Sequence, residues 1–138
     1  MDKALNYLSL ARKAGKAELG EEPVNGITRA VRAALVIVAS DASDHTWRRA
    51  NSFVAGTSQC VLSVPYTKDQ LGFAIGRQEL AIAAMTDASM AQAFVKSLPQ
   101  TDKTVQVLET LDEKIRREKQ RQKEAKAHQK NVRFGKKK

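Results

Sequence analysis

The alternation of two hydrophobic periodicities along the first 98 residues constrains the fold more than any other feature of this chain. Apolar residues at helical spacing predict helices from Asp2 to Gly15, from Glu21 to Ala33, from Thr67 to Gly76 and from Asp87 to Pro99. A further helix is predicted by the stripe of Trp47, Ala50 and Val54, and it ends at Gly56. Between these helices, short apolar and β-branched runs predict strands at residues 16–19, 35–39, 60–64 and 80–85. We therefore expect an α/β fold in which crossover helices cover both faces of a small, mostly parallel sheet.

Capping residues and a helix breaker support these positions. Asp2 and Asp87 are expected N-caps, because their side chains can accept a hydrogen bond from a free backbone N–H in the first turn. The segment from Thr67 to Gln70 matches a capping box, in which two side chains bind each other's backbone. Pro99 ends the last of these helices, since proline has no N–H to donate.

Charge divides the chain into two unequal parts. The 138 residues include 24 Lys and Arg against 15 Asp and Glu, a net charge of +9. Residues 112–138 hold 12 of the basic and 4 of the acidic side chains, so residues 1–111 are close to neutral. We therefore predict a folded domain at residues 1–99, a linker at residues 100–111 and a basic C-terminal arm at residues 112–138.

The composition of the C-terminal part supports this division. Residues 104–108 form a weak β-like patch, and residues 110–113 match a second capping box, so a helix is expected to begin there. After Ile115 no Leu, Ile, Val or aromatic residue occurs until Val132, which leaves such a helix without an apolar face to dock on the domain. The arm is expected to be solvated and partly helical, with residues 135–138 disordered.

A single cysteine and the shortness of the apolar runs indicate the compartment. Cys60 cannot form an intramolecular disulfide, and its place at the start of a strand pattern favours a small core residue over a nucleophile. Residues 33–39, the most apolar stretch, are far fewer than the roughly 20 that a membrane-spanning helix needs. Residues 1–13 lack the apolar block of a signal peptide. We expect a cytoplasmic monomer.

Enzyme signatures are sought at the carboxyl ends of the expected strands, where open α/β sheets bind ligands. Asp41, Tyr66 and Asp87 would lie there, but no phosphate-binding loop and no hydrolase or metalloprotease motif accompanies them. The sequence Ser-Asp-His at residues 43–45 fits a helix N-terminus better than a catalytic triad, whose members converge from separate segments. We expect no catalytic site, metal or cofactor. The alternatives are a phosphate-binding domain or enzyme that uses Asp41 and Asp87, or a protein-interaction module that uses the arm as a partner helix.

The cationic side chains make nucleic acid the favoured partner. If the helix from Glu21 to Ala33 buries its apolar stripe, Arg29 and Arg32 lie one turn apart on its outer side. An anionic membrane fits less well, because a membrane-surface helix needs large apolar residues opposite its charges, and residues 116–131 offer only two alanines. In the arm, phosphate contacts are expected from Arg116, Arg117, Lys119, Arg121, Lys123 and Lys126.

Four motifs carry a resemblance to a known family. They occur in order within residues 3–98: Gly20-Glu21-Glu22-x-Val24, Leu35-Val36-Ile37-Val38-Ala39-x-Asp41, Leu71-Gly72-x-Ala74-Ile75-Gly76 and Ala81-Ile82-Ala83-Ala84-Met85-Thr86-Asp87. In this pattern the chain resembles the ribosomal L-seven-Ae and L-thirty-e superfamily of kink-turn RNA-binding proteins, and in particular its bacterial YlxQ-like branch. The resemblance implies a three-layer α/β/α sandwich around a small four-stranded mixed sheet, and no catalytic activity.

The resemblance also implies two RNA-binding segments, which are residues 16–22, with Arg29 further along the same helix, and residues 76–80. The implied partner is structured, kink-turn-like RNA, in association with the ribosome. The residues expected to bind RNA are Lys16, Gly20, Glu21, Glu22, Arg29, Arg32, Asp41, Arg77, Gln78, Glu79 and Leu80.

The first of these segments departs from the pattern of well-studied kink-turn binders. In those proteins the glycine is followed by Thr-Asn-Glu, whose polar side chains meet the guanine edges of sheared G·A pairs, and a lysine follows on the same helix. This chain has Glu21, Glu22 and Pro23 instead, and Gly26 stands at the position of the lysine. Glu22 can still accept hydrogen bonds from a guanine edge. Two carboxylates that face an RNA backbone weaken binding unless basic neighbours compensate.

Overall fold

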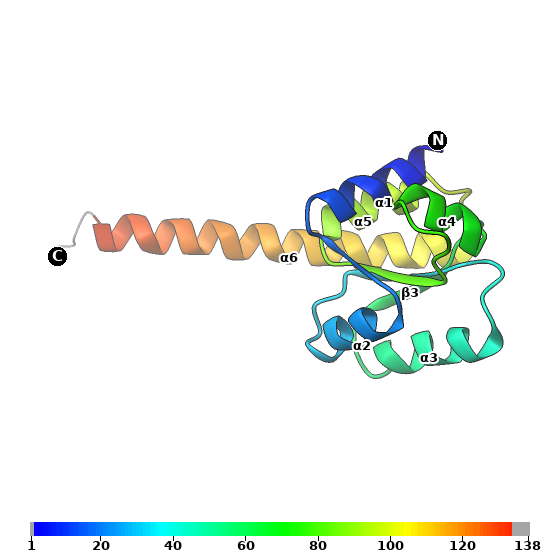
Figure 1. Ribbon diagram of the computed structural model, residues 1–138. Coiled ribbons are helices and arrows are strands. Elements are labelled where there is room, and N and C mark those ends of the chain that lie inside the picture. Colours follow the sequence, from blue (N-terminus) through cyan, green and yellow to red (C-terminus); the bar gives the residue numbers. More distant parts are fainter. Residues whose placement is uncertain (1, 134–138) are drawn as a thin grey trace.

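The computed structural model describes the backbone of residues 2–133 and the side chains of residues 2–128 (Figure 1). Helices and strands alternate along the chain as the sequence predicts, up to a long final helix. The elements are α1 Lys3–Lys13, β1 Ala17–Leu19, α2 Glu21–Arg29, β2 Leu35–Val38, α3 Asp44–Val54, β3 Cys60–Ser63, α4 Lys68–Ala74, β4 Ile82–Met85, α5 Ala88–Lys96 and α6 Asp102–Arg133.

The strands form one mixed sheet in the order β1-β4-β2-β3. Only β2 and β3 are parallel, because β4 runs antiparallel to both of its neighbours. The expectation of a mostly parallel sheet is therefore wrong, while the mixed sheet that the resemblance implies is confirmed. The reason is that α4 does not carry the chain back across the sheet. The backbone N–H of Leu80 donates to the carbonyl of Lys68, 3.0 Å away, so β4 starts at the end of the sheet where β3 stops.

The sheet separates two hydrophobic cores. Along β2, the side chains of Leu35 and Ile37 pack with those of α1, α4, α5 and the first part of α6. The side chains of Val36 and Val38 point to the other face and pack with those of α2 and α3. This alternation follows from the two-residue repeat of a β-strand. The result is the expected three-layer α/β/α sandwich, in which α2 and α3 lie below the sheet in Figure 1.

Helix α6 differs from the prediction for residues 100–115. The β-like patch at residues 104–108 is wrong, and so is the helix start at residue 110, because a single helix begins at Asp102. Its cap is formed by Thr101 and Thr104, whose hydroxyl groups each accept a hydrogen bond from the other residue's backbone N–H, at 3.2 and 2.7 Å. Residues 100–111, expected to be a linker, therefore contain the cap and first turns of a docked helix.

The docking of α6 rests on a short apolar stripe. Val107 and Leu111 are buried in the core that also contains α5, and Ile115 packs against its border. These residues are spaced four apart, so they share one face of the helix. Residues 116–128 are exposed, and this part of α6 projects beyond the sandwich (Figure 1). The disorder expected for residues 135–138 lies outside the described residues.

Candidate nucleic-acid interface

The two predicted RNA-binding segments meet at one end of the sheet, the first of them through residues 20–22. Gly20 is the N-cap of α2, and its backbone N–H donates to the carbonyl of Ile82, the first residue of β4, over 3.0 Å. The loop of residues 76–80 leads directly into β4 and therefore lies at the same end. We call the surface formed by residues 20–22 and 76–80 the α2 edge. The structure thus brings together segments that are more than 50 residues apart in the sequence.

Glycine is required at both segments of the α2 edge. Gly20 has a φ of 94° and Gly76 a φ of 75°, values in the region that favours glycine. Gly72 is required for a different reason, because a Cβ at this position would lie 2.6 Å from Cα of Glu79. The loop also bonds to α4 through the N–H of Arg77 and the carbonyl of Gly72, 2.9 Å apart. The loop of residues 76–80 is therefore packed directly onto the backbone of α4.

The side chains of this loop divide into exposed and buried ones. Arg77, Gln78 and Glu79 are exposed and available to a ligand. Leu80 differs, since its side chain is 3% exposed and belongs to the core. Leu80 can therefore fix the loop in place, while its three predecessors face solvent.

The carboxylates at the α2 edge have structural partners. Glu21, in the first turn of α2, forms an ion pair with Arg49 of α3, and the guanidinium of Arg49 lies 5.2 Å from the ring centre of Phe53. Asp41 accepts a hydrogen bond of 2.8 Å from the backbone N–H of Lys68, so it ties the loop after β2 to the start of α4. Glu22 is exposed. Of the two carboxylates that follow Gly20, Glu21 thus has a basic neighbour that offsets its charge.

Arg49 is absent from the residues that the sequence predicts as RNA contacts. It lies 28 positions from Glu21, and no local pattern links the two. The available signal was the pair of Arg49 and Phe53, which are one helical turn apart and so can interact on one face of α3. That signal identifies the cation–π contact but not the carboxylate that the arginine reaches.

Lys16, Arg29 and Arg32 do not lie at the α2 edge. The carbonyl of Lys16 accepts from the N–H of Thr86 at 3.0 Å, and its ammonium group lies 3.6 Å from the carboxylate of Asp87. This is the other end of β1 and β4. Helix α2 stops at Arg29, four residues earlier than expected, so Arg32 lies in the turn that leads to β2. The predicted RNA-binding residues therefore fall into two groups at opposite ends of the sheet.

The predicted phosphate contacts of the arm lie on α6. Arg116 and Arg117 both bond to Glu113 on the same helix, at 3.2 and 3.1 Å, and Arg116 also lies 3.7 Å from Asp112. These pairs are exposed, so each contributes little to stability and can open to a ligand. The other four predicted arm contacts, Lys119, Arg121, Lys123 and Lys126, are exposed and form no such pair within residues 2–128.

The two carboxylates of the enzyme alternative do not converge. Asp41 follows the end of β2 and Asp87 follows the end of β4, and these strands are antiparallel, with Val38 opposite Ile82. Asp87 accepts from the N–H of Met90 at 3.0 Å, as the expected cap of α5. Among the described residues there is also no cluster of three His, Cys, Asp or Glu side chains that could hold a metal ion.

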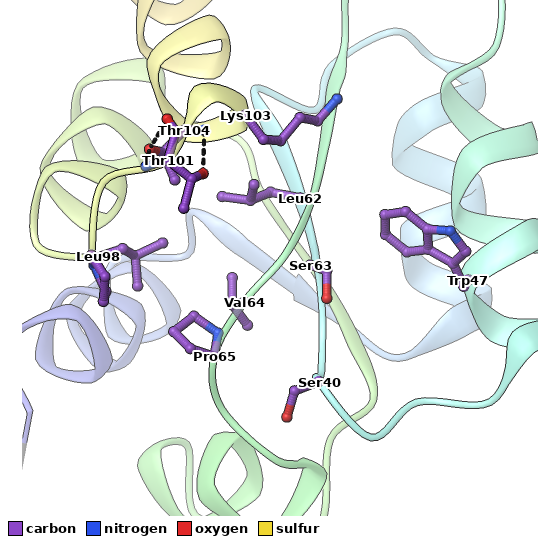
Figure 2. Close-up of a pocket in the computed structure, with 11 residues that line it drawn as sticks. Ser40, Trp47, Leu62, Ser63, Val64, Pro65, Leu98, Thr101, Lys103 and Thr104 are labelled. Atoms are coloured by element: carbon purple, nitrogen blue, oxygen red, sulfur yellow. Dashed lines mark hydrogen bonds between the residues drawn. The ribbon is translucent and has the colours of Figure 1, made fainter.

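A groove of about 520 Å³ lies beside the outer strand β3 (Figure 2). Its lining is mainly apolar and includes Trp47, Leu62, Val64 and Leu98, with Lys103 at one border. The hydroxyl groups of Thr101 and Thr104 in this lining are engaged in the cap of α6, as the dashed lines in Figure 2 show. The groove therefore presents mainly apolar area, with Ser40, Ser63 and Lys103 as further polar side chains of its lining.

The pKa values of two side chains are shifted by burial. Burial raises the pKa of the Cys60 thiol, against the opposing effects of a hydrogen bond with Thr110 and the charge of Lys114. Burial also raises the pKa of Tyr66 to about 12, with a further contribution from its hydrogen bond to the carboxylate of Asp2. Both groups are therefore neutral at pH 7, and Cys60 is a poor nucleophile.

Among the helices that the structure describes, none is long and apolar enough to span a membrane.

Comparison with known proteins identifies the family. The chain is 33% identical over 96 residues to the RNA-binding protein YlxQ of Bacillus subtilis (strain 168), and the alignment covers 66% of this chain and 90% of the relative. The chain belongs to the YlxQ-like family. This is the bacterial branch of the L-seven-Ae and L-thirty-e superfamily that the four sequence motifs indicate. A scan against profiles of known protein families gave no match.

Solved structures share the YlxQ-like fold. A protein of unknown function from Bacillus halodurans matches with a TM-score of 0.65 and 29% identity, over 70% of this chain and 97% of the other. A 15.5 kD RNA-binding protein of Giardia lamblia matches with a TM-score of 0.54 and 16% identity, over 78% of this chain and 87% of the other. At that identity the second match supports the fold alone.

Proposed function

We propose that this YlxQ-like protein is a non-enzymatic RNA-binding protein that recognises structured, kink-turn-like RNA at the α2 edge. The observation that carries the proposal is that its two segments lie at the same end of the sheet, where Gly20 bonds to the first residue of β4, the strand that the second segment enters. A sharp bend in RNA exposes base edges and crowded phosphates together, and a protein reads such a bend by shape with a few polar groups. The α2 edge offers a fixed backbone shape and exposed polar side chains in one place.

The start of α2 supplies groups that suit an RNA bend. The first backbone hydrogen bond of the helix joins the N–H of Val24 to the carbonyl of Gly20, 3.1 Å apart, so the N–H groups of Glu21 and Glu22 lie before the helical ladder. Such N–H groups bind phosphate or base oxygens. The carboxylate of Glu22 can accept hydrogen bonds from the N1 and N2 groups of a guanine. Arg49 compensates the charge of Glu21 and so lowers the repulsion of nearby phosphates.

The arm contributes affinity rather than selectivity in this proposal. Each phosphate that a Lys or Arg of α6 neutralises releases counterions, whatever the sequence of the RNA. The proposal places the protein in the cytoplasm, as a monomer that acts on RNA of the ribosome. The dense cationic arm and the single Cys60 support that setting.

The test compares a kink-turn RNA with a plain RNA duplex of equal length over a salt series. The intact chain is expected to prefer the kink-turn RNA, and removal of residues 119–138 is expected to weaken the binding of both RNAs and flatten the salt dependence without removing the preference. Glu22→Gln should reduce the preference. Asp102→Asn, which removes one negative charge from an exposed position in the first turn of α6, is the control. Equal binding of both RNAs by the intact chain would contradict recognition at the α2 edge.

A further inference from the structure

The charged side chains of the body differ between the two ends of the sheet. At the α2 edge and in the adjoining segments the acidic residues are Glu21, Glu22, Asp41, Asp44, Asp69 and Glu79, and the basic ones are Arg48, Lys68, Arg77 and the Arg49 that pairs with Glu21. At the opposite end Asp87 follows β4 and pairs with Lys16, and the other exposed cations of the body there are Arg12, Lys13, Arg29 and Arg32. These cations favour the binding of a phosphate backbone at the end remote from the α2 edge.

The cations at the end of α2 form no ion pair with the part of the chain that the structure describes. Arg29 and Arg32 are exposed, and within residues 2–128 neither has a carboxylate within 4.0 Å. A basic residue in the last turn of a helix stabilises the helix dipole, which explains Arg29. The same reason does not cover Arg32, because it lies beyond the end of the helix.

Helix α6 adds a second wall of cations to this end. Lys114, Arg117 and Arg121 line a hollow of about 380 Å³ together with Ser58. Their spacing of three and four residues places them on one face of α6, over about 10 Å of helix. Glu109 and Glu113 also line the hollow, and Glu113 is held by Arg116 and Arg117.

The segment with Ser58 connects this wall to the end of α2. The side chain of Gln59 accepts from the N–H of Ala33 at 2.9 Å and donates to the carbonyl of Thr28 at 3.1 Å. Gln59 is buried, so this link is part of the fold and not a surface contact. In Figure 1, α6 leaves the sandwich on the side where α2 ends.

We propose that the end of α2 and this cationic face of α6 together form a second RNA-binding site, which takes the phosphate backbone of an RNA double helix. We call it the arm–body notch and define it by Arg29, Arg32, Ser58, Lys114, Arg117 and Arg121. The body supplies one wall and α6 the other, so a double helix in the notch contacts both. Guanidinium groups bind phosphate in a fork with two hydrogen bonds, which suits the two arginines on each wall to this ligand.

The notch gives the protein two RNA surfaces at opposite ends of one rigid sandwich. The α2 edge reads a bend, and the notch holds a double helix without regard to sequence. The inference rests on the proposed function only in taking RNA as the ligand. It stands even if the α2 edge shows no preference for a kink-turn.

The test uses full-length chains and a plain 20-base-pair RNA duplex as the probe. R29Q/R32Q removes the body wall and R117Q/R121Q the arm wall, and the fourfold variant completes a double-mutant cycle. Each double variant is expected to weaken duplex binding about tenfold at 0.1 M salt, and to reduce the slope of log K against log salt by about one to two. The fourfold variant is expected to lose about the product of the two losses, because the contacts that both walls make with one duplex add in free energy. K3Q/K96Q, which removes two exposed cations from the other end of the body, should leave duplex binding unchanged.

Two outcomes would overturn the notch. If R29Q/R32Q binds the duplex like the intact chain and only lowers the melting temperature, these arginines contribute to the stability of the fold alone. If each double variant loses only about twofold and the fourfold variant loses far more than the product, each wall binds a duplex on its own and the walls act separately. Kink-turn preference, measured in the same variants, reports on the α2 edge instead. Its absence from every chain would refute the proposed function, while the duplex affinities alone would still decide whether the notch binds RNA.

Discussion

At the residue scale, the site depends on contacts that the sequence does not reveal. The carboxylates after Gly20 look unfavourable for RNA binding until Arg49 is seen beside Glu21. Likewise, Gly72 reads as one more residue of a short helix, and only the structure shows the backbone of Glu79 packed against it. The motif that contains Gly72 is visible in the sequence, but its physical cause is a tertiary contact.

Gly72→Ala tests this contact. The added Cβ would lie 2.6 Å from Cα of Glu79 and 2.7 Å from its N, so the loop of residues 76–80 has to move. We expect a loss of about 1–3 kcal/mol in the free energy of unfolding, the usual range for overpacking, together with a weaker kink-turn preference. Gly26→Ala is the matched control, because nothing lies within 4 Å of its added Cβ. In α2 it should stabilise by up to about 1 kcal/mol. Equal stability changes in the two variants would contradict the tight packing of the loop.

At the scale of elements, the sequence predicts the order of helices and strands up to Pro99 well, and α6 poorly. Along β2 and β3 the apolar runs are long enough to mark strands without ambiguity. In residues 104–111 the buried positions are Thr104, Val107 and Leu111, and the first of these is polar. A stripe this sparse and partly polar has no clear period in the sequence. Docking on α5 decides the structure there, and that contact exists only in the folded chain.

Leu111→Ala tests whether α6 is part of the core. Leu111 is fully buried, and truncation of a buried leucine costs about 2–5 kcal/mol. We expect a loss in this range in urea unfolding, although the residue lies in a segment whose composition reads as a linker. Removal of residues 119–138 is the control and should change the free energy of unfolding by less than about 0.5 kcal/mol, since residues 116–128 are exposed. A small effect of Leu111→Ala would mean that α6 is dispensable to the fold.

At the scale of the whole molecule, the direction of β4 determines where the candidate site residues lie. The sequence places Asp41 and Asp87 after strands, which in a parallel sheet would put them together. The antiparallel β4 separates them, whereas strand β1 itself separates Lys16 from Gly20 at the α2 edge. Strand direction is set by how far α4 carries the chain, and this distance has no signature in hydrophobic periodicity. The same topology places the carboxylates of Glu21, Glu22 and Asp41 near one end of the sheet and the cations of Arg29 and Arg32 near the other.

The separation of charge predicts that the two RNA surfaces respond independently to a change at one end. D44N/D69N removes two exposed carboxylates from the first turns of α3 and α4, beside the α2 edge. At 0.1 M salt, where the screening length is about 10 Å, we expect kink-turn RNA to bind two- to threefold more tightly. A plain duplex, held at the other end, should change much less, because α2 alone spans about 13 Å between the ends.

The measurement is the dissociation constant of each RNA at 0.1 and 0.5 M salt, with the intact chain as reference. The gain in kink-turn affinity should vanish at 0.5 M, since screening then acts within a few ångströms. E118Q/E124Q, which removes two exposed carboxylates from the projecting part of α6, should instead favour the duplex. If D44N/D69N strengthens both RNAs equally, the net charge of the protein governs binding, and the two ends are not separate surfaces. If only the kink-turn RNA responds, the polarity of the sandwich assigns the bend to one end and the double helix to the other.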